Sequence, residues 1–138
     1  MYYVSGIMYY ANTSLLKMIK SFTDLDAWKE GHKLVLKIYK ATSLFPDGER
    51  FGLTNQIQRA AVSITSNISE GFSRYSDKEK INFFYISLGS LSELQNQLLI
   101  ARDLDYINKE LFKELASETV IVSKLTNGLI KKLKKNTT

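Results

Sequence analysis

The chain has 138 residues, of which 44% are hydrophobic and 24% are charged, and its formal net charge is +5. This size suits a single domain whose core needs neither a disulfide nor a metal ion. The sequence contains no cysteine and one histidine, His32. It therefore lacks the residues for thiol catalysis, for cysteine-ligated zinc and for a metal site with two or more histidines. We expect no metal and no cofactor.

Residues 1–21 predict a poorly ordered leader in front of a domain that covers residues 22–135. The leader has neither the basic start nor the long apolar run of a signal peptide. The chain also has no uncharged stretch that approaches the length of about 18 residues needed to span a membrane. We therefore expect a cytoplasmic protein with no membrane partner. Because methionines recur in the leader, the true start codon is expected at Met1, Met8 or Met18.

The first helical segment follows Thr23 and Asp24, either of which can cap its start, and it ends at the turn formed by residues 45–48. Within it, residues of the expected buried side recur at alternating spacings of three and four, which is typical of the seam of a bundle helix. This seam is expected to consist of Leu25, Trp28, His32, Val35, Tyr39 and Thr42.

Three further segments show helical periodicity. The second ends near Gly71, the third begins after a cap at Ser76 or Asp77, and the fourth begins at Asn108. Four helices joined by short turns bury their apolar stripes by packing antiparallel to one another. The predicted fold class is therefore all-α, as an antiparallel up-down-up-down four-helix bundle.

The third segment carries a second ordered face beside its core stripe. Because one bundle buries one broad face of each helix, a second stripe indicates a second packing partner, and we expect another copy of the chain. Glycine inside a helix lowers stability by about 1 kcal/mol relative to alanine, so Gly89 suits a place where a neighbouring backbone comes close. The alternative is a third helix that is central in its own bundle. The expected interface residues on this segment are Ile86, Gly89, Ser90, Glu93, Gln97 and Ile100.

The second segment has a polar stripe on the flank of its apolar face. Partly buried polar groups must satisfy one another across a helix or subunit boundary, because each unpaired group costs about 1 to 3 kcal/mol. Arg59 and Glu70 are the charged members, and the edge of an interface is favoured over a ligand site. The expected residues of this edge are Gln56, Arg59, Ser63, Asn67 and Glu70.

Positive charge gathers on the first helical segment and at the end of the last one, where residues 108–138 carry a net charge of +4. These groups are candidate contacts for the phosphates of a nucleic acid. The alternative is a solvated face, partly neutralised by Asp26 and Glu30. The candidate nucleic-acid-binding residues are Lys29, Lys33, Lys37, Lys40, Arg59, Lys124, Lys131, Lys132, Lys134 and Lys135.

No catalytic motif is present, because the sequence lacks the HExxH metal box, the GxxxxGKS/T phosphate loop, the GxGxxG dinucleotide loop and the GxSxG nucleophile elbow. His32 lies on the predicted seam, so a hydrogen-bonded core or interface histidine is expected there in place of a general base. Glu70 and Glu93 are interpreted as structural acids. We expect no catalytic residue and no enzymatic activity.

Three strings of residues, in this order and spacing, resemble a known family. They are FGLTNQIQRAAVSI at 51–64, NISEG at 67–71 and ISLGSLSEL at 86–94. The resemblance is to the four helix bundle proteins, also called 23S rRNA intervening-sequence proteins and sometimes labelled ribosomal proteins, and it extends from residue 22 to about 130. It implies a homopentameric ring of all-α bundles without an established enzymatic activity.

The accessory variability protein of diversity-generating retroelements is similar to this family, and it binds a reverse transcriptase and nucleic acid. One departure weakens the analogy, because Gln58 precedes Arg59 where the family commonly has two successive arginines. The function we expect is a basic homo-oligomeric scaffold that binds RNA or DNA with little sequence specificity. The alternative is a protein-interaction scaffold for a partner such as a reverse transcriptase or a ribosomal component.

Overall fold

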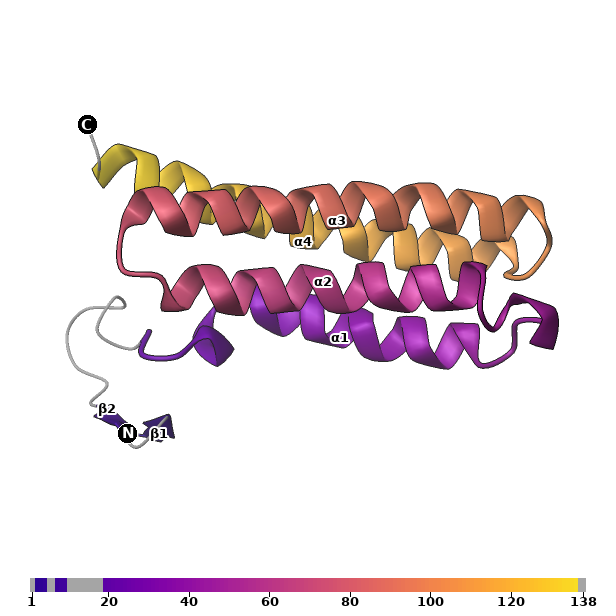
Figure 1. Cartoon of the computed structure of the whole chain (residues 1–138), viewed down its shortest axis with the longest axis horizontal. Helices are drawn as coiled ribbons and strands as arrows, with labels where there is room; N and C mark the ends of the chain where they lie inside the picture. The colour runs from indigo at the N-terminus through magenta and orange to yellow at the C-terminus, as the bar shows by residue number, and fades with distance from the viewer. Residues whose placement is uncertain (1, 5–6, 10–18, 137–138) are drawn as a thin grey trace.

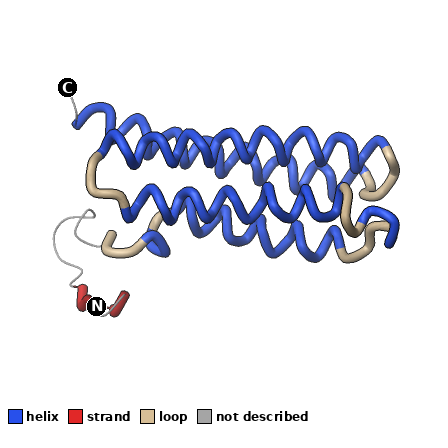
Figure 2. The backbone as a smooth tube through the Cα atoms, viewed as in Figure 1, coloured by secondary structure: helices blue, strands red, loops and turns tan. Residues whose placement is uncertain are grey.

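The computed structural model describes residues 2–4, 7–9 and 19–136. The described chain is dominated by helix, as Figure 2 shows, with four long helices and several short elements. In chain order the elements are β1 (Tyr2–Val4), β2 (Ile7–Tyr9), η2 (Phe22–Asp24), α1 (Asp26–Thr42), η3 (Asp47–Glu49), α2 (Leu53–Ser73), α3 (Asp77–Asp103) and α4 (Lys109–Asn136).

The four long helices form a bundle, which confirms the predicted all-α class. Figure 1 shows the α1–α2 and α3–α4 connections at one end of the molecule and the α2–α3 connection at the other, so consecutive helices run in opposite directions. The C-terminal end of α4 therefore lies at the same end as the start of α1. Positive charges at this helix end suit the dipole of α4.

The predicted leader falls mostly outside the described residues, and Met1 and Met18 are among those left out. Its described part includes β1 and β2, which pair antiparallel with Tyr3 opposite Met8. The leader and the choice of start codon stay predictions.

All four helices contribute to one core. Aliphatic side chains from each helix are buried at the centre of the bundle, where removal of apolar surface from water stabilises the fold. The largest fully buried apolar side chains are Leu34, Ile38, Ile57, Ile64, Ile68, Leu91, Leu94, Leu98, Leu115 and Val122.

Helix α1 buries a different stripe from the one predicted. Leu25 and Thr42 of the predicted seam are buried, but His32 and Tyr39 are exposed. His32 is therefore not a core histidine, and its ring stacks on that of Trp28 at 4.7 Å between centroids. The buried residues within α1 are Ala27, Gly31, Leu34, Ile38, Ala41 and Thr42.

The reason for this error is that two neighbouring stripes of α1 share the same spacing of three and four. The prediction favoured the stripe with aromatic side chains. The stripe that is buried combines Leu34 and Ile38 with small residues, which allow the neighbouring helix to come close. A Cβ atom on Gly31 would lie 3.0 Å from the Thr65 Cγ2 atom of α2. Spacing alone cannot distinguish a buried small-residue stripe from a half-buried aromatic one.

The helix starts agree with the sequence at two of three places. The Ser76 side chain accepts a hydrogen bond from the Glu79 amide at 3.2 Å, and Asn108 Oδ1 accepts one from the Leu111 amide at 2.8 Å. The predicted cap of α1 is wrong, because Asp24 belongs to the short helix η2. There its Oδ2 atom accepts a hydrogen bond from the Ser21 amide at 3.1 Å, as part of a capping box.

Candidate functional site

The residues predicted as an interface on α2 and α3 lie on one surface, which we call the α2–α3 face. The Ser63 and Ser90 hydroxyl oxygens are 2.8 Å apart, and Asn67 Nδ2 donates to the Ser63 backbone and side-chain oxygens at 2.8 and 3.0 Å. Within the polar stripe of α2, Ser63 thus bonds across the boundary with α3, and Asn67 bonds to Ser63 within α2. The α2–α3 face comprises Gln56, Arg59, Ser63, Asn67, Glu70, Ile86, Gly89, Ser90, Glu93 and Ile100.

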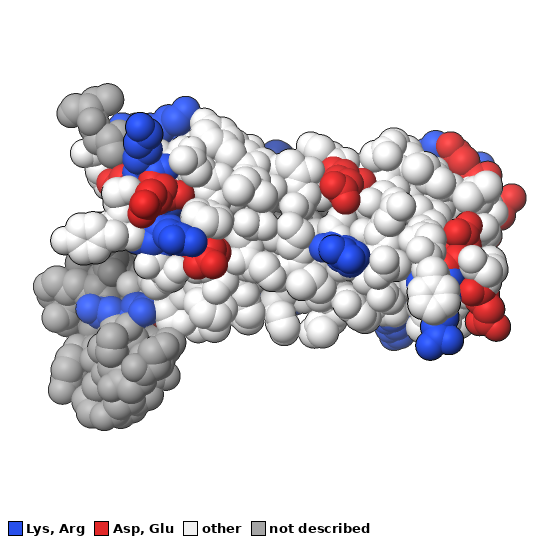
Figure 3. Space-filling model, viewed as in Figure 1, with Lys and Arg blue, Asp and Glu red and all other residues white. Residues whose placement is uncertain are grey.

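The α2–α3 face also presents apolar side chains to solvent. Ile86 is 51% exposed and Ile100 is 40% exposed, and a Cβ atom on Gly89 would meet no described atom within 4 Å. On the side of the molecule where α2 and α3 lie nearest the viewer, Figure 3 shows a mostly uncharged area between two charged ends, interrupted near its middle by an acidic and a basic side chain. Helix α3 is therefore not covered on this side by its own bundle, and the alternative of a central third helix is wrong.

Gln97 lies beneath the α2–α3 face instead of on it. Its side chain is buried, and its Nε2 atom donates to Glu93 Oε1 at 3.2 Å. No described residue donates a hydrogen bond to the Gln97 Oε1 atom. A buried acceptor without a donor costs about 1 to 3 kcal/mol.

The two charged residues of the α2 stripe do not form a pair with each other. Glu70 makes an ion pair with Arg74, at 3.7 Å, one turn further along the chain. The Arg74 guanidinium in turn lies 4.6 Å from the centroid of the Phe83 ring. Arg59 is exposed in the middle of α2, far along the helix from this cluster.

The four predicted lysines of α1 do not form a continuous positive surface. Lys37 contacts the carboxylates of Glu114, at 3.3 Å, and Glu118, both on α4. The hydrogen bond to Glu118 is the main cause that raises the pKa of Lys37 above its usual 10.5, and burial opposes it. Lys33 pairs with Glu30 at 3.3 Å. Two of the four cations therefore have carboxylate partners within the chain.

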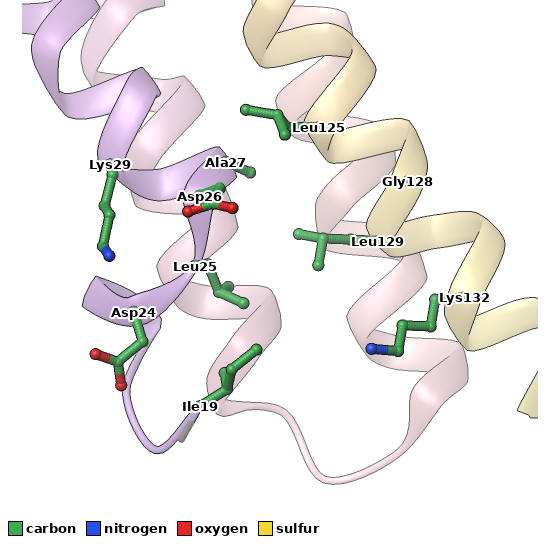
Figure 4. A pocket seen from close by; sticks show the side chains of 10 residues that line it. All are labelled: Ile19, Asp24, Leu25, Asp26, Ala27, Lys29, Leu125, Gly128, Leu129 and Lys132. Atoms are coloured by element: carbon green, nitrogen blue, oxygen red, sulfur yellow. The ribbon is translucent and has the colours of Figure 1, made fainter. Parts of the chain in front are cut away.

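Lys29 and Lys132 both line a hollow between the start of α1 and the end of α4. Figure 4 shows the two lysines on opposite sides of this hollow, with Asp24 and Asp26 near Lys29. Its volume is about 470 Å³, and Leu25 is among the apolar residues that line it. The charges around it have both signs, so it is a poor place for a phosphate chain.

Three of the four lysines at the end of α4 lie around a second hollow with an aromatic ring. This shallow hollow has a volume of about 560 Å³. The Lys134 Nζ atom lies 5.4 Å from the centroid of the Tyr85 ring, which belongs to α3. The lining residues are Tyr85, Asn127, Ile130, Lys131, Lys134 and Lys135.

The sequence did not single out Tyr85 or Asn127, because the spacing of residues along α4 carries no information about which α3 side chain lies beside it. Lys124 is exposed on α4 but does not line this hollow. The candidate basic residues are therefore divided among separate places on the bundle. Three lysines of α4 line one hollow, Lys29 and Lys132 line a second, and Lys37 and Lys40 line a third.

The family comparison agrees with this architecture. The family model for the 23S rRNA-intervening sequence protein matches residues 23–128, which is most of the chain. The chain belongs to this family. The resemblance noted in the sequence is thus confirmed, and the family match covers the bundle through most of α4.

A solved structure of a related protein has the same overall fold. It is a protein of unknown function from the S23 ribosomal protein family of Bacteroides thetaiotaomicron VPI-5482. It shares 25% sequence identity with the chain, covers 76% of the chain and 98% of its own length, and superposes with a TM-score of 0.69. The comparison with curated proteins gave no match.

The described residues contain no candidate metal site and no candidate membrane-spanning helix. Across residues 2–4, 7–9 and 19–136, no group of three or more histidine, cysteine, aspartate or glutamate side chains is placed to hold a metal ion. Within the same part of this family member, no helix combines the length and apolar character needed to cross a bilayer.

Proposed function

We propose that this family member is a non-enzymatic scaffold that assembles with copies of itself, as the pentamer that the family resemblance implies, and binds RNA or DNA with little sequence selectivity. The observation that carries the proposal is the exposed α2–α3 face, with its half-exposed isoleucines Ile86 and Ile100. Contiguous apolar surface rimmed by polar groups is typical of protein interaction sites.

A second apolar surface supports assembly into a ring. On α1, Leu36 is 58% exposed and Tyr39 is 45% exposed, and Val62 is exposed on the neighbouring helix α2. A head-to-tail ring needs two different surfaces on each subunit, so that one surface docks on the other surface of the next copy. The α2–α3 face and this α1 surface meet that requirement.

The charge distribution supports the nucleic-acid part of the proposal. The last helix ends in four lysines, and residues 108–138 carry a net charge of +4. Assembly would repeat this basic end once per subunit, which multiplies weak contacts. Binding that depends on lysine and phosphate is insensitive to base sequence and sensitive to salt.

The assembly test uses size-exclusion chromatography with light scattering on the purified chain. The wild type is expected to have a mass several times that of one 15.8 kDa chain. Ile86→Glu places a charge in the α2–α3 face and is expected to give monomers. Ile121→Glu is the matched control, since Ile121 is a similarly exposed isoleucine, at 47%, on α4. A wild-type monomer at micromolar concentration would contradict the proposal.

The binding test is a fluorescence anisotropy titration of labelled duplex and single-stranded oligonucleotides at several salt concentrations. Affinity is expected to fall steeply with salt, with a slope of about 0.9 per neutralised duplex phosphate on logarithmic axes. Changing Lys131, Lys132, Lys134 and Lys135 to glutamine should reduce that slope, whereas changing Lys109 and Lys113 at the other end should not. If the wild type binds neither oligonucleotide at low salt, the protein-interaction scaffold becomes the better explanation.

A further inference from the structure

The hollow at the end of α4 combines an aromatic ring with cations from a different helix. Tyr85 comes from α3 and is 45% exposed, although Lys134 lies beside its ring. A half-exposed ring of this kind offers a flat apolar surface next to positive charge. Bases of nucleic acids stack on such rings regardless of their identity, because each base has a flat π face.

The polar side chains that α4 contributes to this hollow include three that lie along one side of the helix. Asn127, Lys131 and Lys134 follow one another at spacings of four and three, which places them on the same side of the helix, and all three line the hollow with Tyr85. Lysine ammonium groups bind phosphates as point charges, and the asparagine amide supplies both a donor and an acceptor for a base edge.

Two other lysine-containing hollows differ from this one in their charge. The one at Lys29 is lined by Asp24 and Asp26, and the one at Lys37 and Lys40 is lined by Glu114. Carboxylates at these places repel a phosphate chain. A further hollow at Lys80 and Lys132 has no carboxylate, but its ring, Phe72, is partly buried. The Tyr85 hollow is lined by an asparagine, an isoleucine and three lysines, so it combines a half-exposed ring with cations.

The combination of the Tyr85 ring with the lysines of α4 favours an unpaired strand over a duplex. In a duplex the bases stack on each other and present only their edges, so a tyrosine ring at the protein surface has no base to stack on. In a single strand the bases are free to turn toward an aromatic side chain while the backbone follows the positive groups. The hollow is shallow and open to solvent.

We infer that the hollow formed by Tyr85, Asn127 and the lysines of α4 is a binding site for single-stranded nucleic acid, in which a base stacks on Tyr85 and the neighbouring phosphates contact Lys131, Lys134 and Lys135. This inference rests on the proposed nucleic-acid function and adds its substrate class and the residue that distinguishes single strands from duplexes. Sequence selectivity at this site is low, because stacking accepts any base.

The test compares Tyr85→Leu, Tyr85→Phe and the wild-type chain in anisotropy titrations with a labelled oligouridine of about 16 nucleotides and a duplex of the same length. Tyr85→Leu is expected to weaken binding of the single strand by about fivefold or more, which corresponds to one stacked base, and to leave duplex binding within about twofold. Tyr85→Phe keeps the ring and should bind as the wild type does. Tyr75→Leu is the control, because Tyr75 is an exposed tyrosine that does not line the hollow.

The outcomes separate this inference from the proposed function. If the wild type binds both oligonucleotides and Tyr85→Leu has no effect, the stacking site is wrong and the basic scaffold stands. If Tyr85→Leu weakens both oligonucleotides equally, the selectivity for single strands is wrong. If the wild type binds neither at low salt, the proposed function fails together with the inference. Thermal melting by circular dichroism checks that each variant is folded.

Discussion

Single residues at the contacts between helices decide how closely the bundle packs. Gly71, near the end of α2, lies against the aromatic rings of α3. A Cβ atom placed there would be 2.8 Å from Phe84 Cε1 and 3.1 Å from Phe83 Cβ, and Phe84 is buried. The absence of a side chain at Gly71 therefore lets α2 and α3 approach at the end where they are connected.

We predict that Gly71→Ala lowers the free energy of unfolding by about 1 to 3 kcal/mol, because the added methyl group overpacks a buried contact and its helix propensity gain does not offset this. Urea denaturation followed by circular dichroism measures the change. Gly128→Ala is the control, since a Cβ atom there meets no described atom within 4 Å. That variant should be unchanged or up to about 1 kcal/mol more stable. Equal stabilisation of both variants would show that the Gly71 contact has no effect.

Residue-level prediction from sequence succeeded where the signal is local and failed where it depends on a neighbouring helix. The starts of the third and fourth segments, at Ser76 or Asp77 and at Asn108, were predicted correctly because the hydrogen bonds that cap them join residues three apart. His32 was predicted on the buried seam, as a core or interface histidine, but it is exposed on the surface of its own bundle. Tyr85 was not singled out, because its significance comes from Lys134, which is brought to it only by the packing of α3 on α4.

At the scale of one helix, the central question is which stripe of α1 supports the core. Leu34 is fully buried, whereas Leu36, two residues further, is 58% exposed. We predict that Leu34→Ala lowers the free energy of unfolding by about 2 to 5 kcal/mol, because it removes buried apolar surface and leaves a cavity. Leu36→Ala should cost less than about 0.5 kcal/mol in the monomeric Ile86→Glu background. The two variants are compared by urea denaturation in that background.

A larger effect of Leu36→Ala than of Leu34→Ala would contradict the burial described for α1. The comparison also addresses the general weakness of the seam prediction, since helical spacing locates an apolar stripe but not its angle about the helix axis. Small residues such as Gly31 carried the missing information, because a glycine inside a helix is favoured where another helix comes close.

For the whole molecule, self-assembly links stability to concentration. If folded subunits bind one another and unfolded ones do not, mass action raises the melting temperature as the protein concentration rises. We predict an increase of about 3 °C for each tenfold rise in the concentration of the wild-type chain. The measurement is thermal unfolding by differential scanning fluorimetry over a hundredfold range of concentration.

The same measurement on Ile86→Glu supplies the control. This variant should melt at one temperature at all concentrations, because its α2–α3 face no longer docks. A wild-type melting temperature that is independent of concentration would argue against assembly through this face, and it would leave the binding of nucleic acid to be tested on the monomer.

The sequence by itself determined the number of helices, their approximate limits and the antiparallel bundle, because periodicity, local caps and short turns act within a few residues of one another. It also determined that α3 has two ordered faces, and the family membership. Only the tertiary structure decided which stripe of α1 is buried, that Lys37 is neutralised by α4 and that Tyr85 meets the lysines of the last helix. These features depend on contacts between residues far apart in the chain, and their geometry is set by how the helices rotate and pack against one another.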